Sequence, residues 1–291
     1  MLPRLSGPSS PCQRGVDKLG WKAGGVYGCH GARVGLRSST DDGFEKLVSW
    51  LPKAMTPSRS STAPVMYSLL QGGASTSGRL KRFHLLYRNF TLLVRSLDQG
   101  PIERAFKRDI SMFIGEHASR RVFVHAGVVA IGGGAVVIPG KSFSGKTTLT
   151  RALVEQGGVY YSDEYAVIDS RGRVSPWSEP LSIRMQGPLT AGEPRTAESL
   201  GMRSGRRSLP VRLVVMTSFE KGRRFAPRTE TPGTGALGLL AHTLPAQRRP
   251  RAVLRALSEA VSAAQVIRGP RGEAKEAARK ILRHLATSSS A

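Results

Sequence analysis

The residues whose types and spacing most clearly suggest a chemical function lie in one short segment, 136–149, which reads VVIPGKSFSGKTTL. Gly140, Gly145, Lys146 and Thr147 have the spacing G-x-x-x-x-G-K-[ST] of a phosphate loop. In such a loop the glycines let successive backbone N–H groups turn inward, while the lysine and the hydroxyl address phosphate oxygens and a magnesium ion. The segment therefore predicts a site for a triphosphate with Mg²⁺.

The sequence around this loop predicts a strand before it and a helix after it. The β-branched run before the loop suits a buried strand, and Leu149, Ala152 and Leu153 recur on one face of a helix over 148–156. The N-terminus of that helix would direct its partial positive charge at the phosphates. The residues expected to bind the nucleotide are Gly140, Lys141, Ser142, Phe143, Ser144, Gly145, Lys146, Thr147 and Thr148.

Two acidic residues follow soon after the loop. Asp163 and Glu164 come directly after Ser162, at the end of a short apolar strand expected over 159–161. Two carboxylates at the end of a strand beside a phosphate loop can have different roles, because one can ligate a metal while the other accepts a proton. A solvated turn is the alternative interpretation, which the apolar strand and the preceding phosphate loop disfavour.

The formal net charge of +24 raises the question of a nucleic-acid partner. The excess of Lys and Arg lies mainly in the N-terminal and C-terminal thirds, whereas the third that holds the phosphate loop is nearly neutral. No basic run alternates with aromatic residues, as a platform for single-stranded nucleic acid would require. The composition therefore disfavours nucleic acid and is compatible with acidic or phosphorylated partners.

The length of 291 residues, 40% of them hydrophobic, allows one large domain or two moderate ones, and we expect two. No apolar run is long enough to span a membrane, and the first twenty residues lack the apolar core of a signal peptide. We therefore expect a cytoplasmic protein without a membrane partner. Cys12 and Cys29 imply neither a disulfide framework nor a cysteine metal site. The oligomeric state stays open, and a homo-oligomer is compatible with the sequence.

The pattern along the chain predicts two folded units between flexible ends. We expect an unstructured leader over 1–20, an α+β accessory or substrate-presenting unit over 21–118, a catalytic unit over 119–287 and a frayed tail over 288–291. His30 and His84 stand alone on predicted strands of the first unit, so we interpret them as structural. A long polar segment, 186–208, is expected to form a mobile loop beside the site.

The order of histidine, phosphate loop and acidic pair resembles the catalytic domain of HPr kinase/phosphorylase and, more distantly, the nucleotide site of phosphoenolpyruvate carboxykinase. The resemblance spans 122–184 and is carried by His125-Ala126-Gly127 before the loop, by the loop itself, and by Ser162-Asp163-Glu164. It implies an α+β or α/β fold, in which a P-loop kinase domain with a mixed sheet around the phosphate-loop helix is joined to a smaller N-terminal α+β unit. Transporter-type ATPases and GTPases are disfavoured, because neither a signature loop nor an N-K-x-D motif occurs.

The resemblance also implies an activity, namely ATP-dependent transfer of a phosphoryl group to a Ser or Thr hydroxyl of a protein or peptide. Asp163 would be the base toward the acceptor hydroxyl, and Glu164 would ligate Mg²⁺ together with Thr147. The other expected catalytic residues are His125 beside the phosphates, Lys146, and Arg184 as a stabiliser of transferred charge. ATP and Mg²⁺ are the expected cofactors.

The chain departs from the family pattern at several positions. Glu164 stands where the family carries aspartate, and Lys141 and Phe143 stand where small or acidic residues are usual. The segment 182–186 only partly matches the family's second signature, which is linked to phosphorolysis, so the reverse reaction is not expected. Two alternatives stay open: a kinase that acts on a small molecule, and a non-catalytic module that binds partners in an ATP-dependent manner.

Overall fold

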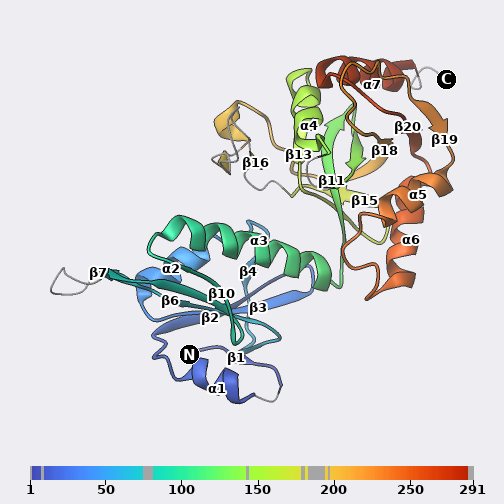
Figure 1. Cartoon of the computed structure of the whole chain (residues 1–291). Helices are drawn as coiled ribbons and strands as arrows, with labels where there is room; N and C mark the ends of the chain where they lie inside the picture. The colour runs from blue at the N-terminus through green and yellow to red at the C-terminus, as the bar shows by residue number, and fades with distance from the viewer. Residues whose placement is uncertain are drawn as a thin grey trace. The chain divides into compact units, whose positions relative to one another are not determined.

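The chain folds into two compact units, Met1–Ser119 and Arg120–Ala291 (Figure 1). The computed structural model describes residues 2–7, 10–74, 81–141, 144–177, 181–182, 194–195 and 197–287. Both units combine helices with mixed sheets, so the mixed α/β class expected from the sequence is confirmed. The division between the units falls beside the boundary expected after residue 118.

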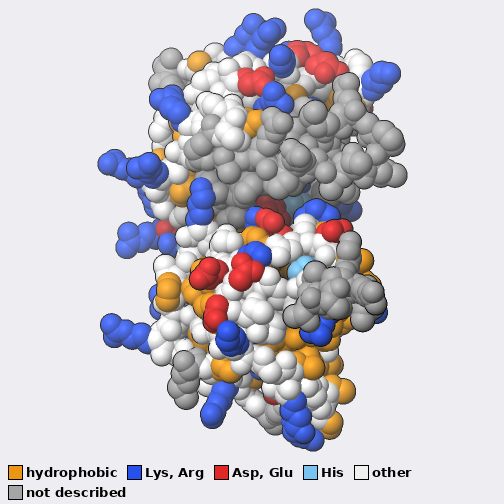
Figure 2. Space-filling model, turned by 90° about the vertical axis from the view of Figure 1, so that its left-hand side faces the viewer, with side chains coloured by type: hydrophobic (Ala, Val, Ile, Leu, Met, Phe, Trp, Pro, Cys, Tyr) orange, Lys and Arg blue, Asp and Glu red, His pale blue; other side chains and the backbone are white. Residues whose placement is uncertain are grey.

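The surface carries charge of both signs. Figure 2 shows Lys and Arg side chains spread over the visible face and interspersed with Asp and Glu, rather than gathered in one continuous basic patch of the coloured residues. Among the helices that the structure describes, none has the length and apolar character needed to cross a membrane.

The first unit is a sheet whose strands run in the order β10-β9-β6-β3-β2-β4. These strands are β2 (Ala23–Cys29), β3 (Ala32–Ser38), β4 (Thr56–Pro57), β6 (Met66–Leu70), β9 (His84–Arg88) and β10 (Thr91–Ser96), and a small ladder is formed by β7 (Gly73–Ala74) and β8 (Lys81–Arg82). Helices α2 (Asp41–Ser49) and α3 (Gln99–His117) pack on one face of the sheet, as Figure 1 shows. The sequence predicts helices over 41–51 and 102–117 and a hairpin of 83–87 with 90–94, and α2, α3 and the β9–β10 hairpin lie close to these segments.

The leader over 1–20, expected to be unstructured, belongs to this unit in its described part. Strand β1 (Arg4–Leu5) pairs with β5 (Thr62–Ala63), and α1 (Pro11–Asp17) begins after Ser10, which caps the helix with its side chain. At the end of α1, Asp17 forms an ion pair of 2.7 Å with Arg37, a buried arginine of the sheet. The polar composition of the leader predicts disorder. The leader is nevertheless ordered in its described part, because Asp17 supplies the counter-charge that the buried Arg37 needs.

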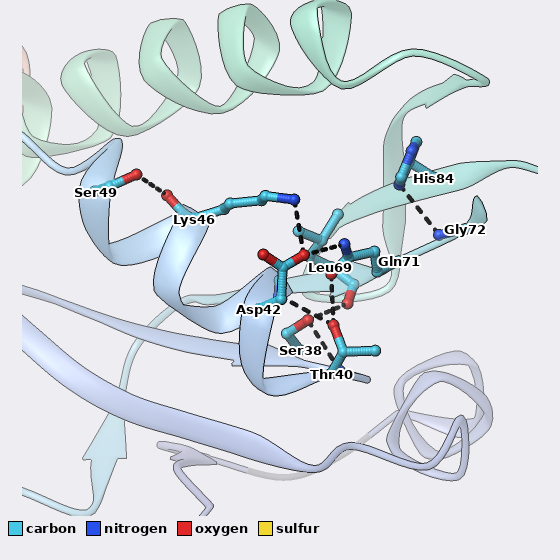
Figure 3. A network of polar contacts seen from close by, with 10 residues as sticks. Ser38, Thr40, Asp42, Lys46, Ser49, Leu69, Gln71, Gly72 and His84 are labelled. Atoms are coloured by element: carbon cyan, nitrogen blue, oxygen red, sulfur yellow. Dashed lines mark hydrogen bonds and ion pairs between the residues drawn. The ribbon is translucent and has the colours of Figure 1, made fainter.

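A polar network fixes the start of α2 (Figure 3). Thr40 caps the helix through its side chain, and Asp42 binds both Lys46 Nζ at 2.7 Å and the amide of Gln71. Nearby, His84 Nδ1 accepts a hydrogen bond of 3.1 Å from a backbone N–H. These groups satisfy one another within the unit, so the network has the structural role that the sequence predicts for His84.

The second unit is built on a sheet that closes partly on itself. Its strands run in the order β12-β11-β14-β15-β18-β20-β19, and β12 also pairs with β18, so the first five form a small barrel. Strand β13 also pairs with β11, antiparallel to it, along Val128–Ala130. The strands are β11 (Val122–Ile131), β12 (Gly134–Pro139), β13 (Val159–Ser162), β14 (Tyr165–Ile168), β15 (Arg173–Ser175), β18 (Leu209–Met216), β19 (Arg228–Glu230) and β20 (Gln265–Arg268), with a separate ladder of β16 (Leu181–Ser182) and β17 (Pro194–Arg195).

Helices cover this sheet on two sides. Helices α4 (Lys146–Glu155) and α7 (Ala274–Thr287) pack together on one side, and α5 (Pro232–Leu240) and α6 (Pro250–Val261) form the other pair, as Figure 1 shows. Successive residues of a strand face opposite sides. Val129 accordingly packs in the core with α4 and α7, whereas its neighbour Val128 packs in the core with α5 and α6.

The segment 186–208, expected to be a mobile loop, is docked in its described C-terminal part. Residues 183–193 and 196 lie outside the described residues, while a short 3₁₀ helix forms at Glu198–Leu200. Ala197 and Met202 are buried against Tyr160 of β13. We refer to residues 197–205 as the strap. The sequence does not reveal this docking, because the apolar residues of the strap, Ala197, Leu200 and Met202, are scattered among polar residues.

Candidate functional site

The predicted phosphate loop connects the end of β12 to the start of α4. Gly145 is the residue that precedes α4 and has φ = 82°, a left-handed conformation that glycine adopts without strain. A Cβ added to Gly140 would lie 2.7 Å from Ser144 Oγ, and one added to Gly145 would collide with the guanidinium of Arg271. The left-handed backbone therefore favours glycine at 145, and a side chain at either position would force Ser144 or Arg271 to move.

Lys146 lies inside this loop. Its side chain is buried, and Nζ donates a hydrogen bond of 2.6 Å to the backbone carbonyl of Lys141. Burial lowers the pKa of Lys146, while the charges of Asp163 and Glu164 act in the opposite direction. An ammonium group has three donors, so this bond leaves two N–H groups for phosphate oxygens.

Asp163 lies directly beside the loop. Its Oδ2 accepts a hydrogen bond of 3.1 Å from Thr147 Oγ1, and its Oδ1 accepts one of 2.9 Å from the hydroxyl of Tyr160. Burial raises the pKa of Asp163, although the hydrogen bonds from Tyr160 and Thr147 lower it. The structure thus brings the predicted loop hydroxyl and one member of the predicted acidic pair, Asp163, together.

His125 stands between the loop and the acidic pair. Its backbone carbonyl accepts a hydrogen bond of 3.2 Å from the N–H of Gly140, and the N–H of Ala126 donates one of 3.0 Å to the carbonyl of Glu164. At Gly127 a Cβ would collide with a buried threonine hydroxyl of α4. The His-Ala-Gly segment therefore joins both parts of the site and lets the phosphate-loop helix approach β11.

We expect protonation of His125 to destabilise the folded chain. Burial, followed by the positive charge of Lys146 and the neighbouring His242, lowers the pKa of His125 from 6.5 to about 4. The unfolded chain therefore binds a proton at higher pH than the folded chain, and the free energy of unfolding should fall as pH drops from about 6.5 to about 4.

Urea denaturation across this pH range should show a shallower loss of stability for His125→Gln than for the wild type. Parallel pH profiles for the two proteins would contradict the low pKa of His125. Well above pH 6.5 the imidazole is neutral in both the folded and the unfolded chain, so there the pH dependence of the two proteins should coincide.

Two further residues of the site, His242 and Arg271, belong to no motif of the sequence. The carbonyl of His242 accepts a hydrogen bond of 2.8 Å from the N–H of His125, and burial and the loop lysines lower the pKa of His242. Arg271, with 2% of its surface exposed, donates a hydrogen bond of 2.8 Å from Nη2 to the carbonyl of Gly145. Both come from segments far along the chain, and no spacing in the sequence connects them to the loop.

The remaining predicted residues are placed differently or lie outside the described residues. Lys141 and Thr148 are exposed at the loop and at the first turn of α4. Ser142, Phe143 and Arg184 fall outside the described residues. In the part of the chain that the structure describes, no group of three or more His, Cys, Asp or Glu side chains is arranged to hold a metal ion.

Comparison with solved structures shows a distant likeness. No protein-family model matches the chain, and no curated protein matches it. Among solved structures, the HPr(Ser) kinase/phosphatase from Coxiella burnetii is similar, with 17% sequence identity and a TM-score of 0.34, over 58% of this chain and 99% of that chain. The chain is therefore distantly similar to an HPr(Ser) kinase/phosphatase, the family that its sequence motifs resemble.

Proposed function

We propose that the second unit binds ATP and Mg²⁺ at the loop between β12 and α4 and transfers the γ-phosphoryl group to a Ser or Thr hydroxyl of a protein or peptide. The observation that carries the proposal is the hydrogen bond of 3.1 Å between Thr147 Oγ1 and Asp163 Oδ2. This bond joins Asp163 of the acidic pair to Thr147 of the phosphate loop. A loop that only bound phosphate would not require a half-buried carboxylate beside it, because removing a carboxylate from water is unfavourable.

The residues present suit both cofactors. Lys146 has two N–H donors besides the one bonded to the carbonyl of Lys141, and these can address phosphate oxygens. Thr147 and Asp163 provide the hard oxygen ligands that Mg²⁺ prefers, so these two residues would hold it. When bound, the ion would supply neutralisation of charge on the phosphate oxygens.

The contacts of Asp163 favour an exchange of the roles that the sequence assigns to the acidic pair. Both oxygens of Asp163 already accept hydrogen bonds, and one donor is Thr147, the hydroxyl expected on the metal. We therefore place Asp163 on the metal side. We assign the role of the base to the neighbouring Glu164, since both carboxylates act electrostatically on Lys146.

In the proposed transfer, the acceptor oxygen forms a bond to the γ-phosphorus, and the bond from that phosphorus to the oxygen bridging to ADP breaks. The hydroxyl proton passes to Glu164. Lys146 stabilises the charge that develops on the phosphoryl oxygens. His125 is neutral near pH 7 because its pKa is about 4, so it would donate a hydrogen bond without adding charge. Arg184 is proposed as a further stabiliser of transferred charge, and the first unit as the part that presents the acceptor.

The test uses the full chain, labelled ATP, Mg²⁺ and a panel of peptides that carry Ser or Thr. We expect Mg²⁺-dependent transfer of label to a hydroxyl of at least one peptide. Turnover of a metabolite without any labelled peptide would select a small-molecule kinase instead. Tight ATP binding without transfer to any acceptor would select a non-catalytic binding module.

A further inference from the structure

We propose that Tyr160 is a positioning residue that holds the carboxylate of Asp163 and couples it to the strap, residues 197–205. This inference rests on the proposed function, because it gives Tyr160 a role in presenting Asp163 to the metal. Tyr160 lies on β13, three residues before Asp163, and none of its surface is exposed. It belongs to no motif that the sequence singles out.

The hydroxyl of Tyr160 completes the environment of the carboxylate. It donates a hydrogen bond of 2.9 Å to Asp163 Oδ1, while Thr147 Oγ1 donates to Oδ2 on the other side. The phenol O–H is the donor of this bond, because a carboxylate oxygen can only accept. Two donors on two different oxygens fix the rotation of the carboxylate. Loss of either one would free it to turn.

The strap is bound to Tyr160 by both its backbone and its side chains. The N–H of Tyr160 donates to the carbonyl of Arg203 at 2.9 Å, and the N–H of Gly205 donates to the carbonyl of Tyr160 at 2.8 Å. The ring of Tyr160 is packed in a small core with Ala197 and Met202. A displacement of the strap must therefore displace Tyr160, and through its hydroxyl the carboxylate of Asp163.

The adjacent residue on the same strand provides a matched control. Tyr161 faces the other side of β13, where it packs in the core with α5 and α6. Its hydroxyl donates a hydrogen bond of 2.8 Å to the carbonyl of Arg207 rather than to Asp163. Tyr161→Phe therefore removes the same chemical group from a buried tyrosine without touching the proposed metal ligand.

The first experiment measures binding of ATP to the full chain as Mg²⁺ is titrated, for the wild type, Tyr160→Phe and Tyr161→Phe. A hydrogen bond to a charged group is strong, so Tyr160→Phe should raise the Mg²⁺ concentration needed for half-maximal binding about 10-fold. Binding without Mg²⁺ should change by less than about twofold, because the loop itself is untouched. Tyr161→Phe should leave both quantities within about twofold of the wild type.

Equal effects of the two substitutions would overturn the role of Tyr160 while leaving the proposed function intact. A wild type that binds ATP without any response to Mg²⁺ would instead overturn the proposed function, and this inference with it. Thermal unfolding of each variant checks that it folds, since both substitutions keep the aromatic ring.

A second experiment tests the strap with Met202→Ala, which loosens its packing on Tyr160 and leaves the hydroxyl of Tyr160 in place. The substitution should raise the Mg²⁺ requirement about threefold in the wild type and have no effect on it in the Tyr160→Phe background, since coupled residues are not additive. The same increase in both backgrounds would show that the strap does not act through Tyr160.

Discussion

Replacement of Lys146 by methionine is expected to lower the rate of phosphoryl transfer about 10²- to 10³-fold, the usual loss when one preorganised donor to a developing negative charge is removed. Methionine fits the site, because the lysine side chain is long and only 6% exposed. What is lost is the ammonium group, which lies within the loop and bonds to the carbonyl of Lys141. Initial rates of label transfer from ATP to an acceptor peptide measure the effect.

Lys141→Met is the matched control for this substitution. Its side chain is exposed and belongs to the same loop, and only its backbone carbonyl contacts Lys146. A charge on the surface is screened by water, so transfer should change by no more than about fivefold. Similar losses for both substitutions would mean that the overall charge of the loop, rather than the buried ammonium group, supports the reaction.

The second large effect separates the two carboxylates of the acidic pair. Glu164→Gln is expected to keep Mg²⁺-dependent ATP binding and to lower the transfer rate about 10²- to 10⁴-fold, as the loss of a general base does. Asp163→Asn is expected to abolish the response of ATP binding to Mg²⁺ and, with it, the transfer. The physical reason is the bond between Asp163 and Thr147, which places Asp163 at the hydroxyl expected on the metal. ATP titrations with and without Mg²⁺, followed by single-turnover transfer, measure both steps.

The reverse pattern would restore the assignment made from the sequence, with Asp163 as the base and Glu164 on the metal. Glu155→Gln serves as the control for loss of a carboxylate, because Glu155 lies on the phosphate-loop helix, where it pairs with Arg151 on the surface. A surface pair of this kind contributes little, so both binding and transfer should stay within about twofold of the wild type.

The elements with a strong periodic pattern could be predicted from the sequence. Helix α3 shows a helical repeat of apolar residues, and β18 is a nearly continuous apolar run, so local patterning is sufficient to place them. The closure of the barrel could not be predicted in this way. It depends on the pairing of β12 with β18, two strands joined by a long stretch of chain, and no local pattern specifies such a partner.

The docked segments were missed for a related reason. The leader and the strap are rich in polar residues, and each is held by a few specific contacts, such as the ion pair of Asp17 with Arg37 and the packing of Met202 on Tyr160. Composition averages over a segment and therefore does not reveal a single buried contact. These contacts exist only where another part of the chain offers a partner.

What the sequence by itself determined is which residue types stand in the loop and in the acidic pair, and from these the chemistry that we propose. The pattern of Gly140, Gly145, Lys146 and Thr147 depends on short-range spacing, which a local sequence records. Only the tertiary structure decided that Thr147 lies against Asp163, which changes the roles we propose for the two carboxylates.

Tyr160, His242 and Arg271 also contact the site in the tertiary structure, although no sequence pattern predicts these contacts. Tyr160 bonds to the carboxylate of the acidic pair, whereas His242 and Arg271 reach the site from segments far along the chain. The physical reason is that a hydrogen bond depends on distance in space, and the sequence records only distance along the chain.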